Sequence, residues 1–435
     1  MPSEAPAPAI DPATLLPPSR AFLVPGAIVR VSTDAAGAEA DADSTDPALS
    51  DPALSGAARF VAFQSRADNL VPGDANGAED VFLKDLRTGA ITLASTDADG
   101  AQSPARSLYP SISATGRYVA FDRLPSFAQS PGPDARTDVF VKDLRTGSLQ
   151  RASAAADGTP GDGDSYGAPS LSANGRRVAF SSQAANLLPG DTNDTADVFV
   201  KNLRTGGIAL ASADAAGVPG NSFSEQPSLS ADGLHVAFSS RATNLLPGDD
   251  THGAEQVFVK DLRTGAVAAA SADAAGAPGD DASLNASISA DGRFVAFSSA
   301  ASNLVPGDTN GTADVFVKDM QTGAVVLASA DAAGNGALGF SGAPALSPNG
   351  RFVAFESTAV NLVPGAGGGH ADVFRRDLWT GGISLVAANP PPPGRTGISF
   401  TRSAVSDTGA VAFASRAGDL VPGDARGVFD VFLSG

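Results

Sequence analysis

One tripeptide recurs along this chain at a nearly constant interval. The motif Asp-Val-Phe, replaced once by Gln-Val-Phe, begins at seven positions: Asp80, Asp138, Asp197, Gln256, Asp314, Asp372 and Asp430. Successive copies begin 58 or 59 residues apart. A fixed period of this length indicates a repeat architecture in which each copy forms one structural unit. Seven such units restrict the possible folds more than the composition does.

The fifth copy shows the content of one unit most clearly. Four short segments rich in Val and Phe are predicted to be strands, here called A to D: 286–289, 294–298, 314–319 and 324–329. Tight turns containing Gly join A to B and C to D, whereas the B–C connection is long. Seven units of four strands predict an all-β fold, a seven-bladed β-propeller with antiparallel blades.

Two phenylalanines in every unit mark the expected core. Strand B carries Phe63, Phe121, Phe180, Phe238, Phe297, Phe355 and Phe413, and strand C carries Phe82, Phe140, Phe199, Phe258, Phe316, Phe374 and Phe432. These are 14 of the 23 phenylalanines. Because large apolar side chains recur at two fixed places in each unit, they are predicted to pack between neighbouring blades.

The last unit has no strand D, and the N-terminal region supplies a match for it. Residues 26–37 resemble residues 323–334, which contain strand D of the fifth unit. We therefore expect residues 26–33 to pair with the last blade, 401–435, and to close the ring without an exposed sheet edge. This makes 26–435 one propeller and leaves 1–25, with seven prolines, as a disordered leader.

Composition limits the classes of partner and compartment. The formal net charge of −18 disfavours nucleic acid as a partner, because an acidic surface repels phosphates. There is no cysteine, so disulfides and thiolate metal sites are ruled out. The sequence contains no run of 18 apolar residues, so no membrane-spanning helix is predicted. The N-terminal region does not have the pattern of a signal peptide. A monomer is expected.

The repeat resembles the TolB-type, WD-repeat-like propeller repeat of bacteria. The similarity is carried by Pro-x-(Leu/Ile)-Ser-(Ala/Pro)-(Asp/Asn)-Gly-Arg-x-Val-Ala-Phe, as at 169–180, 227–238 and 344–355, followed by Asp-Val-Phe-Val-x-Asp-Leu. It covers residues 26–435, although the B–C connection is longer than usual. The resemblance implies a propeller and an exported protein, secreted, periplasmic or on the cell surface. No catalytic motif carries over, since such propellers serve accessory proteins, peptidases and sugar lyases.

Long connections and acidic residues are expected on the same face of the propeller. In a four-stranded meander the B–C and D–A connections lie at one end of the blade, and functional residues concentrate on such loops. The acidic residues expected there are Asp74, Asp191, Asp249, Asp250, Asp308 and Asp424 in the B–C loops and Asp162, Asp164, Asp280 and Asp281 in the D–A loops. A protein or glycan ligand is expected to bind this acidic loop face.

Three B–C loops share a spacing that suggests calcium. The pattern Asp-x-Asn-x-x-x-Asp gives nine candidate ligands: Asp74, Asn76, Asp80, Asp191, Asn193, Asp197, Asp308, Asn310 and Asp314, with Asn193 and Asp197 four apart. Calcium takes six to eight oxygen ligands, and the loops lack the distal bidentate Glu of stronger sites. The alternative is turn chemistry, in which Asn and Asp side chains bond the local backbone. The remaining blades lack the complete pattern.

No catalytic constellation is evident in the sequence. His235, His252 and His370 lie in different units, and there is no serine nucleophile motif. We therefore interpret the chain as a non-enzymatic binding or scaffold propeller. The alternative is a polysaccharide lyase or hydrolase acting at the mouth of the channel, which would need a cluster of His, Tyr, Arg or Lys that breaks the repeat there. The candidates for such a cluster are Tyr109, Tyr166 and Arg402.

Overall fold

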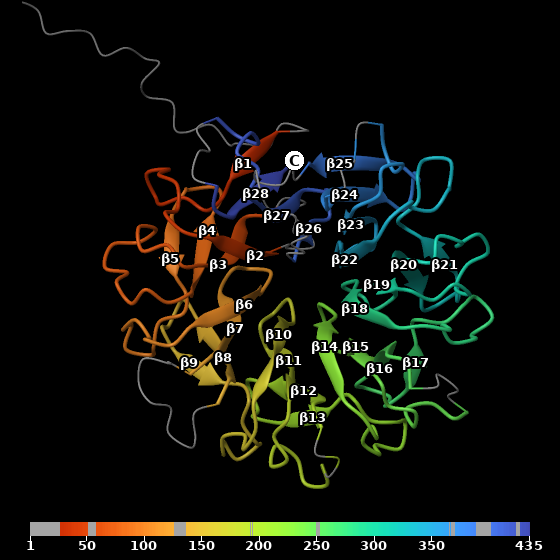
Figure 1. Ribbon diagram of the computed structural model, residues 1–435. Helices are drawn as coiled ribbons and strands as arrows, with labels where there is room; N and C mark the ends of the chain where they lie inside the picture. The colour runs from red at the N-terminus through yellow and green to blue at the C-terminus, as the bar shows by residue number, and fades with distance from the viewer. Residues whose placement is uncertain are drawn as a thin grey trace, which may run out of the picture.

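The seven units form seven blades around a central channel. The computed structural model describes residues 27–50, 58–125, 136–191, 193, 195–248, 253–364, 366, 370–388, 402–422 and 427–435. These residues form seven four-stranded antiparallel sheets (Figure 1). The predicted all-β, seven-bladed β-propeller is confirmed. Among the described residues there is no helix that could cross a membrane.

Each blade contains strands A to D in order from the channel to the rim. Blade 1 contains β2 (Ser44–Leu49), β3 (Phe60–Ser65), β4 (Asp80–Asp85) and β5 (Ile91–Leu93). Blade 2 contains β6 (Ser107–Ile112), β7 (Tyr118–Arg123), β8 (Asp138–Asp143) and β9 (Leu149–Arg151). Blade 3 contains β10 (Ser165–Leu171), β11 (Arg177–Ser182), β12 (Asp197–Asn202) and β13 (Ile208–Leu210). Blade 4 contains β14 (Ser224–Leu229), β15 (His235–Ser240), β16 (Gln256–Asp261) and β17 (Val267–Ala269).

The remaining three blades follow the same order. Blade 5 contains β18 (Ser283–Ile288), β19 (Phe294–Ser299), β20 (Asp314–Asp319) and β21 (Val325–Leu327). Blade 6 contains β22 (Ser341–Leu346), β23 (Phe352–Ser357), β24 (Asp372–Asp377) and β25 (Ile383–Ala387). Blade 7 contains β26 (Ala404–Val405), β27 (Val411–Ser415), β28 (Asp430–Ser434) and β1 (Ile28–Arg30).

The innermost strand differs most from its predicted bounds. In blade 5 strand C covers 314–319 as predicted, but strand A begins at Ser283, three residues before the predicted start. The pairing of β18 with β19 changes register between Leu284 and Ser287, which marks a bulge. A bulge breaks the alternation of inward and outward side chains, so the pattern on which the prediction relied is lost there.

The N-terminal strand closes the ring as predicted. Strand β1 pairs with β28, and the register places Ile28 opposite Ser434 and Arg30 opposite Phe432. The hydroxyl of Ser32 donates to the buried carboxylate of Asp430 at 2.5 Å, which adds a side-chain bond between the two ends of the chain. The proposed leader, 1–25, lies outside the described residues.

The core lies between the blades and is centred on the phenylalanines. Strand B and strand C phenylalanines are direct cross-strand partners, as with Phe297 and Phe316, whose ring centroids are 5.9 Å apart. Thirteen of the fourteen are buried, and Phe297 packs against Ala237 and Val257 of the preceding blade. The exception is Phe140, which is partly exposed. The predicted core is therefore confirmed.

A buried lysine on strand C connects five of the blades to the blade before. The Nζ of Lys318 donates to the carbonyl oxygens of Ala272 at 2.9 Å and Asp273 at 2.7 Å, just beyond β17. The equivalent lysines are Lys84, Lys142, Lys201 and Lys260, and Arg376 does the same in blade 6. Burial lowers the pKa of Lys318. The carbonyl groups therefore replace water around a buried cation.

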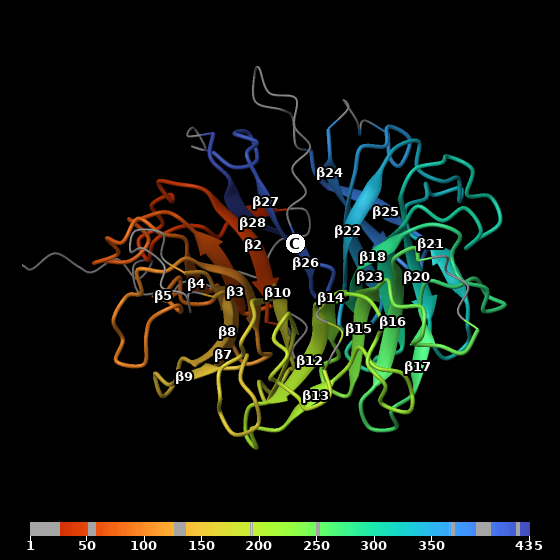
Figure 2. The same cartoon turned by 60° about the horizontal axis from the view of Figure 1, so that its bottom comes forward.

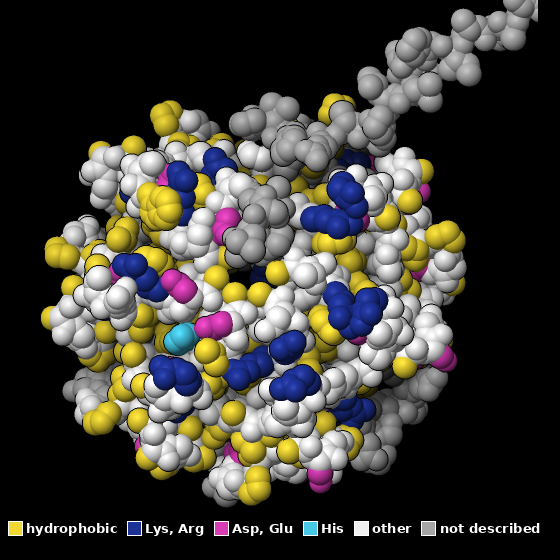
Figure 3. Space-filling model, turned by 180° about the vertical axis from the view of Figure 1, so that it is seen from behind, with side chains coloured by type: hydrophobic (Ala, Val, Ile, Leu, Met, Phe, Trp, Pro, Cys, Tyr) yellow, Lys and Arg dark blue, Asp and Glu magenta, His cyan; other side chains and the backbone are white. Residues whose placement is uncertain are grey.

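The two faces of the propeller differ in their connections (Figure 2). The tight A–B and C–D turns lie on one face, where Lys and Arg side chains gather around the channel (Figure 3). Several of these pair within a blade, for example Arg293 with Asp319 at 2.8 Å. The opposite face carries the B–C and D–A connections and is called the loop face here. Of the acidic residues expected on it, Asp249, Asp250 and Asp424 lie outside the described residues.

Candidate functional site

The predicted calcium ligands at the start of strand C are buried and fully hydrogen-bonded. In β20 the carboxylate of Asp314 accepts a hydrogen bond from the Ser329 hydroxyl at 2.5 Å and another from Nδ2 of Asn310 at 2.5 Å. Burial raises the pKa of Asp314 to about 6, and these two hydrogen bonds act in the opposite direction. The same arrangement holds for Asp80 with Ser95 and Asn76, and for Asp197 with Ser212 and Asn193.

The asparagine of the pattern also bonds the backbone. Nδ2 of Asn310 donates to the carbonyl of Ala337 at 2.7 Å, in the D–A connection, and Oδ1 accepts from the amide of Thr312 at 2.8 Å. Both of its polar atoms are therefore engaged without a cation. This is the hydrogen bonding that the turn interpretation requires.

Two blades that lack the asparagine replace its donor by another side chain. In blade 4 Nε2 of Gln256 donates to the carbonyl of Gly279 at 3.1 Å, and Oε1 accepts from the Ser271 hydroxyl at 2.6 Å. In blade 2 Nη1 of Arg136 donates to the carbonyl of Gly161 at 3.4 Å. A bond to the D–A connection, from the B–C loop in blade 2 and from the first residue of strand C in blade 4, is thus retained where the calcium pattern is not.

The outer aspartates of the pattern lie closer to solvent. The carboxylate of Asp74 accepts a hydrogen bond from Nε2 of Gln102 at 2.5 Å. Burial raises the pKa of both Asp74 and Asp308. Within the part of the chain that the structure describes, no group of three or more His, Asp or Glu side chains is placed to hold a metal ion. Calcium binding at these loops stays a prediction.

A second group of residues surrounds the channel, and the sequence reasoning did not assemble it. At the bulge of each innermost strand from blade 1 to blade 6, a non-glycine residue adopts a positive φ: Asp46 (50°), Tyr109 (53°), Ala168 (58°), Gln226 (56°), Asn285 (58°) and Ala343 (49°). Arg402 occupies the same repeat position in blade 7, two residues before Ala404. These seven residues are called the channel ring here. Such backbone conformations are unfavourable for L-residues and are found where the surroundings enforce them, often at functional sites.

The residue type varies from blade to blade at the channel ring, whereas the residues that follow it recur in most blades. Proline stands one residue after the ring residue in five of the seven copies, and Ser or Ala stands two residues after it. The ring residue itself, however, ranges from Ala to Tyr and Arg. A framework role would favour one residue type in all copies. The signal that could have revealed the ring is this variation in an otherwise regular repeat.

Side chains of the preceding blade hold the backbone of the ring. Oε1 of Gln64 accepts from the amide of Tyr109 at 2.8 Å, and Oε1 of Gln226 accepts from the amide of Asn285 at 3.2 Å. Between blades 2 and 3 Oδ2 of Asp122 accepts from the amides of Gly167 at 3.1 Å and Ala168 at 3.4 Å. At these three positions the ring backbone is therefore held by side chains that also differ from blade to blade.

Asp122 is an unusual carboxylate. It is 1% exposed, and its Oδ1 has no hydrogen-bond partner among the described residues. Burial raises the pKa of Asp122 to about 7, although the amides of Ala168 and Gly167 and the charge of Arg402 act in the opposite direction. Asp122 is therefore partly protonated at neutral pH.

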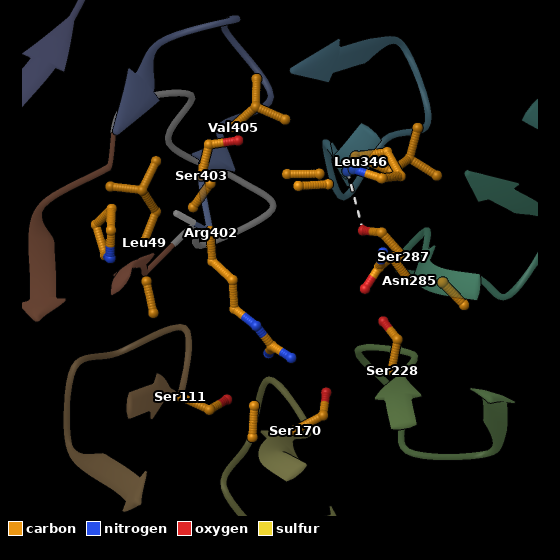
Figure 4. Close-up of a pocket in the computed structure, with 18 of the residues that line it drawn as sticks. Leu49, Ser111, Ser170, Ser228, Asn285, Ser287, Leu346, Arg402, Ser403 and Val405 are labelled. Atoms are coloured by element: carbon orange, nitrogen blue, oxygen red, sulfur yellow. Dashed lines mark hydrogen bonds between the residues drawn. The ribbon is translucent and has the colours of Figure 1, made fainter. Parts of the chain in front are cut away.

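The structure brings two of the three repeat-breaking candidates together. The guanidinium of Arg402 lies 5.9 Å from the centroid of the Tyr109 ring, which is 38% exposed. Arg402 extends from blade 7 into the channel (Figure 4). Tyr166 is not part of this pair, and its hydroxyl accepts a hydrogen bond from Nε2 of Gln183 at 3.3 Å.

The channel contains a cavity of about 330 Å³ next to Arg402. Five serines line it, and in four of them the hydroxyl oxygen accepts a hydrogen bond from a backbone amide of the next blade: Ser111 from Leu171, Ser170 from Leu229, Ser228 from Ile288 and Ser287 from Leu346, at 2.9–3.1 Å. Figure 4 shows the serine hydroxyls and Arg402 around the same space. Since each oxygen already accepts, its proton is left to donate to a ligand.

The described histidines do not contribute to this cavity. A Cβ added to Gly292, in the next A–B turn, would lie 2.5 Å from the His235 ring, so His235 packs closely on that turn. His370 lies in the B–C loop of blade 6, and His252 is outside the described residues. The histidines give no support to a catalytic centre at the channel.

Comparisons with known proteins agree on the fold. An oligogalacturonate lyase in complex with manganese is 12% identical, and the match covers 95% of this chain and 98% of that one, with a TM-score of 0.56. An oligogalacturonate lyase from Vibrio parahaemolyticus is 10% identical, with 94% and 98% covered and a TM-score of 0.53. The chain has their β-propeller fold.

A TolB protein is also among the structural neighbours. TolB from Acinetobacter baumannii is 17% identical, with a TM-score of 0.42, and the match covers 78% of this chain and 62% of TolB. The chain thus matches less than two thirds of the length of that protein. No protein-family model matches the sequence, and no curated protein sequence matches it.

Proposed function

We propose that this propeller is a non-enzymatic binding module whose ligand enters the central channel from the loop face. The supporting observation is the channel ring, where seven equivalent positions carry six residue types on an otherwise repeated frame. Binding sites in propellers and other closed folds are concave, with a few polar groups that fix the ligand. The ligand class is a protein segment or a glycan, and export of the protein belongs to the same proposal. Fractionation of the source cells tests the export.

The acidic loop face would act as the approach to this site. Carboxylates on the face would attract a cationic or polar ligand and repel nucleic acid. Calcium at the Asp308, Asn310 and Asp314 loop would lower this negative charge locally.

The binding test uses one matched pair of tyrosine variants. Wild type, Tyr109→Ala and Tyr166→Ala are applied to glycan and peptide arrays, because both tyrosines lie on innermost strands but only Tyr109 contacts Arg402. We expect ligands that are lost with Tyr109→Ala and retained with Tyr166→Ala. Ligands that bind both variants as well as wild type would indicate recognition outside the channel and contradict the proposal.

A polysaccharide lyase is the second candidate, because two neighbours are oligogalacturonate lyases. A lyase needs a base that removes a proton next to a carboxylate, and Tyr109 beside Arg402 is the available pair. Burial raises the pKa of Tyr109, so its hydroxyl stays protonated at neutral pH and is a weak base. We therefore favour binding over catalysis.

Incubation with oligogalacturonate, with and without manganese, distinguishes the two functions. We expect the absorbance of the unsaturated product not to rise above that of a blank without substrate. An increase that disappears in Tyr109→Phe would replace the binding proposal by the lyase.

A further inference from the structure

We infer that the channel cavity holds the carboxylate of a small hydroxylated ligand on Arg402. This inference rests on the proposed function and names the chemistry of its ligand. The first observation is that the exposed side chain of Arg402 extends into the channel and lines the cavity. A guanidinium is a planar donor that matches a carboxylate in two-point contact.

The second observation is the chemistry of the cavity wall. The hydroxyl protons of Ser111, Ser170, Ser228 and Ser287 are available to a ligand because their oxygens already accept backbone amides. Gln226 and Asn285 also line the cavity and add amide groups. Such a wall offers several hydroxyl and amide donors, which suit an anion that carries hydroxyl groups.

The nearby acids do not fill this role. Asp46 and Asp122 interact electrostatically with Arg402, but neither lines the cavity. Both form hydrogen bonds that do not involve the guanidinium: Asp122 accepts from two amides of blade 3, and Asp46 accepts from the hydroxyl of Thr45 and from the backbone of Arg402. Arg402 therefore keeps an open side toward the channel.

The size of the cavity sets the size of the ligand. A volume of about 330 Å³ lies at the lower end of ligand sites and suits a molecule the size of one sugar ring. The exposed ring of Tyr109 lies beside Arg402, just outside the cavity lining, and offers an apolar surface at its edge. The three contacts together point to a monosaccharide-sized acid.

Calorimetric titration of the full chain with glucuronate and glucose tests the inference, because the two sugars differ at one carboxylate. We expect glucuronate to bind roughly tenfold or more tightly than glucose, since one charge-assisted pair supplies about that factor. Arg402→Gln should abolish the difference and Arg402→Lys should keep part of it. Arg241→Gln, a loop-face arginine outside the cavity, is the control and should change nothing.

Other outcomes separate the inference from the proposed function. Equal binding of the two sugars, lost in Tyr109→Ala, overturns the carboxylate assignment and leaves a channel ligand in place. Sulfate that binds as tightly as glucuronate means that the site takes any oxyanion, which also contradicts the inference. If glucuronate does not bind at millimolar concentration, the inference is wrong. If the array ligands also bind Tyr109→Ala as well as wild type, the proposed function is wrong together with the inference.

Discussion

The Oε1 atom of Gln256 accepts a hydrogen bond from the hydroxyl of Ser271 at 2.6 Å, in the place where blade 5 uses the carboxylate of Asp314 and Ser329. The other end of the same Gln side chain donates to Gly279, which is the task of Asn310 in blade 5. One amide thus replaces an Asp and an Asn. What the repeat retains is a hydrogen bond from the start of strand C or the loop before it to the D–A connection.

The calcium hypothesis predicts a thermal shift. A cation at Asp308, Asn310 and Asp314 would stabilise the fold by about 1.4 kcal/mol at ten times its Kd. Weak extracellular sites have Kd values on the order of 0.1 to 1 mM, so millimolar calcium should raise the melting temperature by several degrees and EDTA should reverse it. Calorimetry measures both.

The control for calcium removes the carboxylates alone. The triple variant Asp80→Asn, Asp197→Asn and Asp314→Asn should lose the calcium response. An unchanged melting temperature of wild type in calcium would assign the aspartates to turn chemistry only.

Removal of the N-terminal strand should destabilise the propeller strongly. Deletion of 1–33 removes β1 and the Ser32 hydroxyl that bonds Asp430, and it exposes the edge of β28. It also removes Thr33, whose carbonyl accepts from Lys84 of blade 1. Thermal unfolding and solubility should show a large loss, whereas deletion of 1–20 should be nearly neutral. Equal stability of the two deletions would contradict closure by β1.

Truncation of a core phenylalanine should depend on its burial. Phe297→Ala should cost about 3–5 kcal/mol, because it empties a site between two blades. Phe140→Ala should cost less, since that ring is partly exposed. Denaturant unfolding compares the two, and equal costs would mean that burial does not set the energy of this site.

Stability should fall as pH rises from 5 to 8. The pKa of Asp122 is raised by burial to about 7, so the folded state holds a proton that the unfolded state releases near pH 4. The stability associated with this proton is present at low pH and is lost as pH rises through 7, by up to about 4 kcal/mol. Asp197 and Asp314, with pKa values raised to about 6, act in the same direction.

Asp122→Asn isolates this contribution. The variant keeps an oxygen for the amides of Gly167 and Ala168 but cannot ionise, so its stability should change less between pH 5 and 8. Chemical unfolding at several pH values measures the slope. The same slope in both proteins would show that Asp122 does not titrate in this range.

The repeat period of the sequence predicted much of the fold. It did not predict features that depend on contacts between blades. The Asp-Val-Phe motif located strand C, and the phenylalanines located the core, because both recur with every blade. The bulge at Asn285 and the lysine bonds such as that of Lys318 were missed, because both depend on contacts with a neighbouring blade. Tyr109 and Arg402 were noted as exceptions, but only closure of the ring brings blade 7 beside blades 1 and 2.

The bulge of the innermost strands has a consequence for how such a protein changes over generations. Each ring side chain projects from a backbone held by its neighbours, while the phenylalanines carry the packing elsewhere. Substitution at Ala168 or Ala343, whose side chains make none of the hydrogen bonds that hold the ring, can therefore alter what the channel accepts with little effect on folding. The seven positions are variable sites on a constant framework, and a designed library that varies them could be selected for new ligand specificities.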